Sequence, residues 1–228
     1  MNRPVVFIAA LLMVATQTAN AGTANLPIQA GGTFNVPVMS MKEERFRATV
    51  RQQYDFSCGS AALSTLLTYH YSYPVSEQTV FAEMFQRGDR QRIQQQGFSL
   101  LDIKMFLERH GFEANGYEAS LDKLESARIP AIVLFKENGY THFVVVKGMR
   151  EGRVLIGDPA GGTRVMARDN FEKLWANQIL FVISNKAEVA TFNSSADWHV
   201  APLAPISNGV NHDGLSTMQL PKLGSSDF

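Results

Sequence analysis

Short, apolar, β-branched segments separated by turn signals fill the second half of this chain, and this pattern restricts the fold more than any other feature. Residues 131–135, 142–147 and 153–158 are three such segments, with Asn138-Gly139 and Glu151-Gly152 between them. Turns this short join neighbouring antiparallel strands. A helical stretch at 168–175 precedes a fourth segment at 179–183. The pattern predicts an antiparallel sheet built largely from consecutive hairpins.

The preceding region has the 3.6-residue periodicity of helices. Helices are expected from Cys58 to about residue 71, from about Ser76, from Ser99 and over residues 120–127. Ser99 and Asp102 have capping-box spacing, and Gly111 is placed to end that third helix. The polar stretch 84–96 between helices is interpreted as a solvated loop. Helices followed by an antiparallel sheet define an α+β fold.

The ends of the chain differ in composition from this domain. Residues 1–21 combine a short positive start, an apolar run and an Ala-x-Ala site, which is typical of a cleaved secretory signal peptide. We therefore predict a signal peptide at 1–21, an irregular lead-in at 22–40, a domain at 41–185 and a mostly disordered tail at 186–228. Export by this route indicates the periplasm, with no stable membrane span after cleavage.

Overall composition excludes several classes of function. Lys+Arg and Asp+Glu both number 21, so the chain has no net positive charge that would favour binding to nucleic acid. The five histidines do not have the spacing of a metal-binding motif, and neither a metal nor a cofactor is expected.

Cys58 is the single cysteine of the chain, and it stands where an apolar helix is expected to begin. Unpaired N–H groups and the positive end of the dipole favour a thiolate there. Gly59 allows a substrate to approach the backbone closely. Gln52, six residues earlier, can supply a second oxyanion donor beside the Cys58 N–H, and Gln53 is the weaker alternative. A small buried core residue is the competing interpretation of Cys58.

His142 begins one predicted strand and Asp158 ends the next. A hairpin around Glu151-Gly152 brings both to the same end of the sheet, which is the arrangement that a Cys-His-Asp triad requires. In this hypothesis Asp158 accepts the Nδ1 proton of His142. The alternatives are a core histidine and, for Asp158, a turn former before Pro159.

These motifs resemble the bacteriocin-processing (double-glycine) cysteine peptidases, with Q-x-x-x-x-x-C-G-x-A followed by an H-F-V-V-V strand and a strand ending in G-D-P-A. The resemblance covers roughly residues 51–183 and implies a papain-like fold, with Cys58, His142 and Asp158 catalytic and Gln52 in the oxyanion hole. Ser57 departs from the acidic residue usual before the nucleophile. The R-Q-Q-Y-D-F-S-C-G string in a small exported chain is most similar to the accessory peptidases of functional-amyloid (Fap) secretion systems.

The resemblance implies an exported hydrolase that cleaves a peptide or protein, with amyloid subunits or their export pore as partners. Two alternatives stay open. The triad can transfer an acyl group to an amine, as in an acyltransferase or transglutaminase, or an idle domain can bind an export signal without cutting it. Gly31-Gly32 is a candidate self-processing site, although a flexible linker is the favoured interpretation of this pair.

Overall fold

The structure is a computed structural model that describes residues 22–28, 32–38, 40–137 and 139–200. The predicted signal peptide and residues 201–228 of the predicted tail lie outside the described residues, as do Gly31 and Asn138. The chain divides into two units, Met1–Met41 and Lys42–Phe228.

The first unit contains a β-hairpin where an irregular lead-in was expected. Strands β1 (Gly22–Ile28) and β2 (Gly32–Val38) pair antiparallel, with Asn25 opposite Asn35. The expectation was wrong because it relied on the glycine and proline content of this segment and missed a sequence repeat. Both strands read G-T-x-N-x-P-x, a pattern that places similar residues at alternate positions of each strand.

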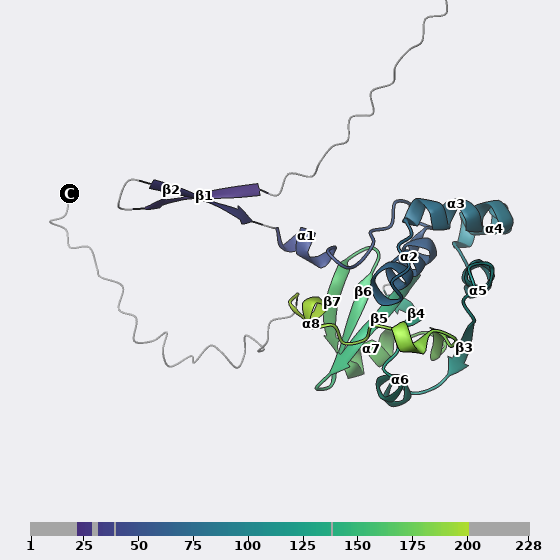
Figure 1. Ribbon diagram of the computed structural model, residues 1–228. Helices are drawn as coiled ribbons and strands as arrows, with labels where there is room; N and C mark the ends of the chain where they lie inside the picture. The colour runs from purple at the N-terminus through teal and green to yellow at the C-terminus, as the bar shows by residue number, and fades with distance from the viewer. Residues whose placement is uncertain (1–21, 29–31, 39, 138, 201–228) are drawn as a thin grey trace, which may run out of the picture. The chain divides into compact units, whose positions relative to one another are not determined.

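The second unit is an α+β domain, as predicted (Figure 1). Its helices are α1 (Met41–Arg45), α2 (Cys58–His70), α3 (Glu77–Arg87), α4 (Arg90–Gln96), α5 (Leu100–Arg109), α6 (Leu121–Ala127), α7 (Arg168–Leu174) and α8 (Ser195–Trp198), with a 3₁₀ turn η1 (Ala187–Val189). Its strands are β3 (Ala114–Glu118), β4 (Ala131–Glu137), β5 (Tyr140–Arg150), β6 (Arg153–Asp158), β7 (Gly162–Ala167) and β8 (Ile179–Ile183). None of the described helices has both the length and the apolar character needed to cross a bilayer.

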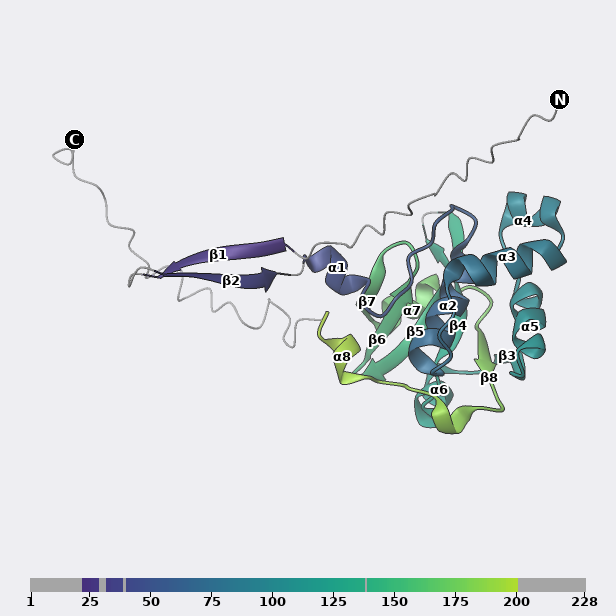
Figure 2. The ribbon, with the colours of Figure 1, turned by 45° about the horizontal axis from the view of Figure 1, so that its top comes forward.

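The sheet has strand order β3-β8-β4-β5-β6-β7, and every pairing in it is antiparallel. Alternate residues of β5 enter two cores. Phe143 and Val145 pack with α2, α3 and α5, whereas Val144 and Val146 pack with α6 and α7. Helices therefore cover both faces of the sheet, and Figure 2 shows α3, α4 and α5 grouped on the side of α2.

Two sequence signals at helix starts are confirmed. The Ser76 side chain accepts a hydrogen bond from the Thr79 N–H at the start of α3, and Ser99 and Asp102 form a reciprocal capping box at α5. The predicted loop at 84–96 was wrong, because it contains the end of α3 and all of α4. Ile93 is fully buried and anchors α4 to the core. It is a single apolar residue among polar ones, so the sequence shows no helical periodicity there.

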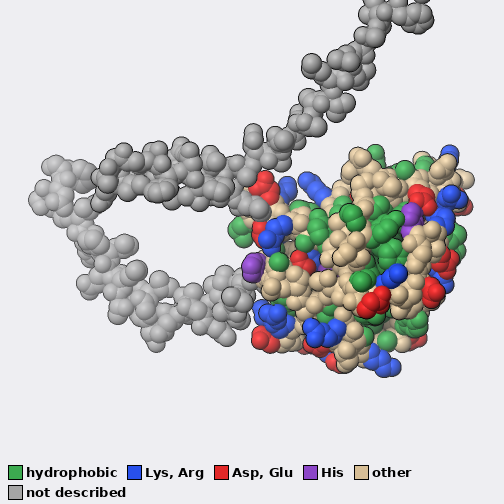
Figure 3. Space-filling model, in the orientation of Figure 1, with side chains coloured by type: hydrophobic (Ala, Val, Ile, Leu, Met, Phe, Trp, Pro, Cys, Tyr) green, Lys and Arg blue, Asp and Glu red, His purple; other side chains and the backbone are tan. Residues whose placement is uncertain are grey.

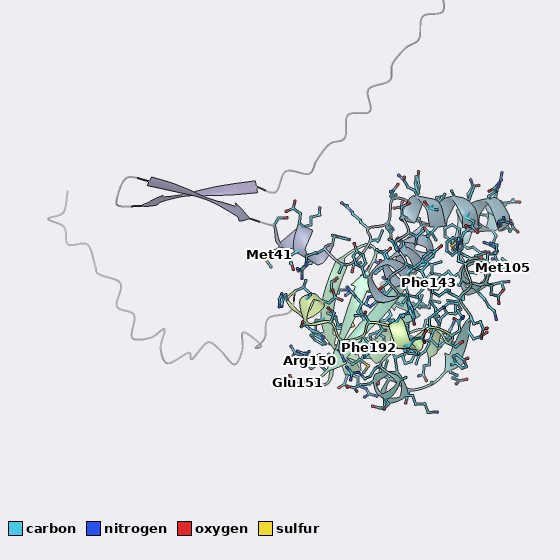
Figure 4. The ribbon with its side chains drawn as sticks, viewed as in Figure 1. Met41, Met105, Phe143, Arg150, Glu151 and Phe192 are labelled. Carbon is cyan, nitrogen blue, oxygen red and sulfur yellow. The ribbon has the colours of Figure 1, made fainter. Side chains whose placement is uncertain are left out.

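The predicted disordered tail is also corrected where it is described. Residues 187–200 lie against the domain, and α8 lies beside β6 and β7 in both views (Figures 1 and 2). Phe192 and Trp198 are buried, and Asn193 donates its N–H to the Lys147 carbonyl while its side-chain oxygen accepts from the Met149 N–H. We call residues 187–198 the C-terminal strap. Figure 4 labels Phe192 and Arg150, which mark the strap and the end of β5.

Candidate active site

Cys58 is the first residue of α2, as predicted. The Ser57 side chain does not cap this helix. Its hydroxyl instead accepts from the Tyr54 N–H at 3.1 Å and donates to the Tyr54 carbonyl at 3.0 Å. The loop before α2 is thus fixed by Ser57 while the first N–H groups of the helix stay available to a group at its N-terminus.

The Cys58 side chain is buried, with only 6% of the residue exposed. Burial raises the pKa of the Cys58 thiol, and the N–H groups of Phe143, Gly59 and Cys58 itself offset part of that rise. The shift is thus opposite in direction to the low-pKa thiolate that the sequence predicts. The helix N-terminus acts in the predicted direction, but removal of water from the sulfur has the larger effect.

His142 lies near the start of β5, and Asp158 ends β6, so the β5–β6 hairpin brings them to one end of the sheet as predicted. The His142 Nε2 is 3.5 Å from the Asp158 Oδ2. It is therefore Nε2, and not the expected Nδ1, that faces the carboxylate. Within the described residues neither ring nitrogen has a formed hydrogen bond, so Nδ1 is available to another group.

Asp158 is both a turn former and a neighbour of His142, so the two interpretations of its sequence position hold together. Its Oδ1 accepts from the N–H groups of Ala160 and Gly161, which makes it a turn former, while its Oδ2 lies 3.1 Å from Arg164. Burial alone would raise the pKa of Asp158, but His142, the Ala160 N–H and the Arg164 charge together hold that pKa below its usual value. The carboxylate is thus kept ionised next to the imidazole.

The structure separates the two glutamines before Cys58. Gln52 is half-buried, and its N–H donates to the Pro159 carbonyl at 3.1 Å, which ties it to the Asp158 turn. Its side-chain amide donates to the Tyr54 carbonyl at 3.2 Å. Gln53 is exposed and accepts a hydrogen bond from Gln78 of α3. The contacts favour Gln52 over Gln53 as a group near the thiol, and its oxyanion role stays a prediction.

A pocket of about 390 Å³ adjoins Cys58, within the size range of ligand sites. Its lining consists of Asp55, Phe56, Cys58, Gln94, Gln95, Gln96, Gly97, Tyr140 and Thr141. Phe56 lines this pocket, whereas Phe98 is buried in the core. Sequence reasoning missed Tyr140, although residues two apart on a strand share a face and Tyr140 precedes His142 by two.

Among the described residues, no three His, Cys, Asp or Glu side chains are grouped as metal ligands. His110 ends α5 and contacts Tyr73 and Glu83.

A second pocket of about 330 Å³, lined by Trp175 and residues of α6 and α7 among others, shares no residue with the first. On the face seen in Figure 3, acidic and basic side chains alternate rather than gather by sign.

Comparison with known proteins identifies the family. Residues 47–187 match the Peptidase C39 family. A "Probable functional amyloid protease FapD" of Pseudomonas aeruginosa is 41% identical over 77% of this chain and 78% of its own length. A Pseudomonas fluorescens protein of the same description is 38% identical over 76% of each chain.

A solved structure shows the same fold. The peptidase domain of Streptococcus ComA, described as a bi-functional ABC transporter involved in a quorum sensing pathway, superposes with a TM-score of 0.51 at 22% identity. The superposition covers 60% of this chain and 97% of the ComA peptidase domain. The predicted papain-like α+β fold and the resemblance to double-glycine processing peptidases are confirmed. The chain belongs to the Peptidase C39 family and is a cysteine peptidase.

Proposed function

We propose that this protein is an exported peptidase that cleaves a peptide or protein in the export or assembly of functional amyloid, with Cys58, His142 and Asp158 as its catalytic triad. One observation carries the assignment of residues. The start of α2 and the shared end of β5 and β6 bring a buried thiol, an imidazole and an ionised carboxylate together beside a pocket.

The geometry supports acyl transfer through a thioester. His142 Nδ1 takes the thiol proton as the Cys58 sulfur attacks the peptide carbonyl carbon. The imidazolium then protonates the leaving amine nitrogen as the C–N bond breaks. A water molecule, deprotonated by His142, attacks the thioester, and the thiol is restored as the acid product leaves. Asp158, facing Nε2, stabilises the imidazolium in both halves.

Two donors are available for the oxyanion. The Cys58 N–H lies at the start of α2, where it has no partner within the helix. Gln52 carries two N–H bonds on its amide, so its bond to Tyr54 leaves one for the oxyanion. Loss of one such donor typically costs about 100- to 1000-fold in rate.

The proposed biological role rests on the relatives. Both Pseudomonas proteins carry the description of a functional amyloid protease and match about three quarters of this chain. The signal-peptide pattern of residues 1–21 favours the periplasm, where an amyloid subunit or a component of its export pore is the substrate.

The test compares host cells that carry the wild-type protein or the Cys58→Ala variant. Free N-termini in the periplasmic fraction are labelled and identified by mass spectrometry. We expect new N-termini in proteins of the amyloid system only with the wild type, each with a matching hydrolysed C-terminus. Identical N-termini in both strains would contradict a peptidase role, and products joined to amines would identify acyl transfer instead of hydrolysis.

A further inference from the structure

Tyr140 occupies an unusual position beside the proposed nucleophile. It is the first residue of β5, and it lines the 390 Å³ pocket together with Cys58. Half of this side chain is exposed (52%), whereas Cys58 and His142 are only 6% and 7% exposed. A residue on the surface therefore lies next to two reactive groups that have almost no surface of their own.

Both the ring and the hydroxyl of Tyr140 are held. The ring stacks on the His142 imidazole, with centroids 5.8 Å apart and an interplanar angle of 23°. The hydroxyl donates a 2.6 Å hydrogen bond to the Asp55 carbonyl, in the loop that precedes α2. These two contacts fix an otherwise exposed side chain in one position.

The hydrogen bond joins two walls of the pocket. Asp55 and Phe56 belong to the wall that leads to Cys58, while Tyr140 and Thr141 belong to the β5 wall. Residues 94–97, at the end of α4, line the same pocket. A substrate group that enters beside Cys58 must fit within the space bounded by the Tyr140 ring or displace it.

The electrostatics agree with this proximity. Partial burial raises the pKa of the Tyr140 phenol, and negative charge on Cys58 and Asp55 raises it further. The raised pKa favours the protonated phenol, which is the form that donates the hydrogen bond to Asp55.

We propose that Tyr140 is a specificity-determining residue that limits the size of the substrate group admitted beside Cys58. The proposal rests on the proposed role of Cys58 as the nucleophile. The Asp55 bond holds the ring across the pocket and the His142 stack supports it from behind, so bulky groups are excluded while a slender chain reaches the sulfur.

The test uses two thiol reagents of different size, iodoacetamide and N-(1-pyrenyl)maleimide. Cys58 is the single cysteine of the chain, so each labelling rate reports on this one sulfur. The ratio of the two second-order rates is measured for the wild type, Tyr140→Phe and Tyr140→Ala. Taking a ratio cancels any change in the pKa of the thiol, since both reagents consume the thiolate.

In Tyr140→Ala we expect the pyrenyl-to-iodoacetamide ratio to rise by about tenfold or more, which corresponds to ~1.4 kcal/mol in the barrier. Tyr140→Phe keeps the stacked ring but loses the Asp55 bond, so its ratio should lie between those of the wild type and Tyr140→Ala. Tyr117→Ala, at a tyrosine of similar exposure on β3, should leave the ratio at the wild-type value.

An unchanged ratio in both Tyr140 variants would overturn the proposal, as would an equal rise in Tyr117→Ala. Tyr140→Phe retains the aromatic packing, so the test remains decisive if the alanine variant folds poorly. Labelling does not require hydrolysis. Failure of the proposed peptidase role would appear as cleavage by Cys58→Ala, a separate result from the size ratio.

Discussion

Two buried pairs of a basic and an acidic side chain involve the same strand, β5, and they are built in opposite ways. His142 faces Asp158 at 3.5 Å, beside a pocket, and its ring nitrogens have no formed hydrogen bond within the described structure. Lys147, five residues along, is fully buried and lies 3.1 Å from Asp197 of the C-terminal strap. Its ammonium also donates to the Ala48 carbonyl at 2.8 Å and has Thr163 at 3.4 Å.

The difference indicates what each pair does. Lys147 lies at a β-bulge between β5 and β6, where the side chain is turned into the protein and the strap supplies partners for the backbone. All three of its ammonium donors have partners. Both ring nitrogens of His142 are buried without a formed hydrogen bond among the described residues. Burying unpaired polar atoms lowers the stability of the fold, and it is expected where a group must exchange protons. One pair serves the fold, and the other is proposed to serve the chemistry.

The largest expected effect is on rate. In His142→Ala we expect cleavage of the substrate identified in cells to fall by about 10²- to 10⁴-fold, the usual contribution of a general base. Asp158 keeps Arg164 and two backbone N–H groups, so the fold should hold. Steady-state kinetics with His110→Ala as control measure this. Near-wild-type activity in His142→Ala would remove the contrast between the two pairs.

The next effect is on stability. Lys147→Met leaves the buried Asp197 carboxylate without its partner, and the free energy of unfolding should fall by about 3–5 kcal/mol. Urea denaturation measures it. The control, Arg87→Met, breaks a partly exposed pair with Glu83 and should cost no more than about 1 kcal/mol. Equal losses in both variants would show that burial of Lys147 has no special weight.

A third effect depends on pH. Burial, followed by the charge of Lys147, lowers the pKa of His70 from 6.5 to about 4, and the ring remains neutral with Nδ1 donating to the Thr191 carbonyl. Below pH 6.5 the unfolded chain therefore binds a proton that the folded chain does not. Stability is retained above that pH and lost as the pH falls toward 4, by roughly 3 kcal/mol.

Urea titrations between pH 7 and 4 test this, with His70→Gln as the matched variant that cannot titrate. We expect a shallower loss of stability in the variant over this interval. Parallel curves for the two proteins would mean that His70 does not contribute to the acid sensitivity of the Lys147 region.

The smallest expected effect concerns the end of the strap. The Arg150 guanidinium lies 5.0 Å from the Trp198 ring centroid, with Arg153 at 5.6 Å from the same ring. Arg150→Gln should cost about 0.5–1 kcal/mol, the usual value of a cation–π contact near the surface. Thermal unfolding measures the shift. A loss as large as that of Lys147→Met would place the main anchor of the strap at Trp198 instead.

The sequence predicts most of the site because its groups occupy ends of regular elements. Cys58 begins a periodic apolar helix, and the Glu151-Gly152 turn fixes which ends of β5 and β6 meet. Turn chemistry and periodicity are local properties, so they survive without knowledge of the tertiary fold.

What the sequence hides depends on contacts between distant residues. Which His142 nitrogen faces Asp158 depends on the ring rotamer, and the rise in the pKa of Cys58 depends on burial that no local pattern records. The strap looks polar and rich in turns in the sequence. The contacts that hold residues 187–198 against the domain, among them the Asn193 hydrogen bonds and the Lys147–Asp197 pair, join it to residues far away in the chain.

The central claim is that Cys58 is the nucleophile, and purified protein tests it most directly. Wild type and Cys58→Ala are incubated with the amyloid subunits and export components of the host, and the fragments are followed by intact mass. The account predicts paired fragments from a single hydrolysed bond with the wild type and none with Cys58→Ala. Cleavage at a comparable rate by Cys58→Ala would contradict it.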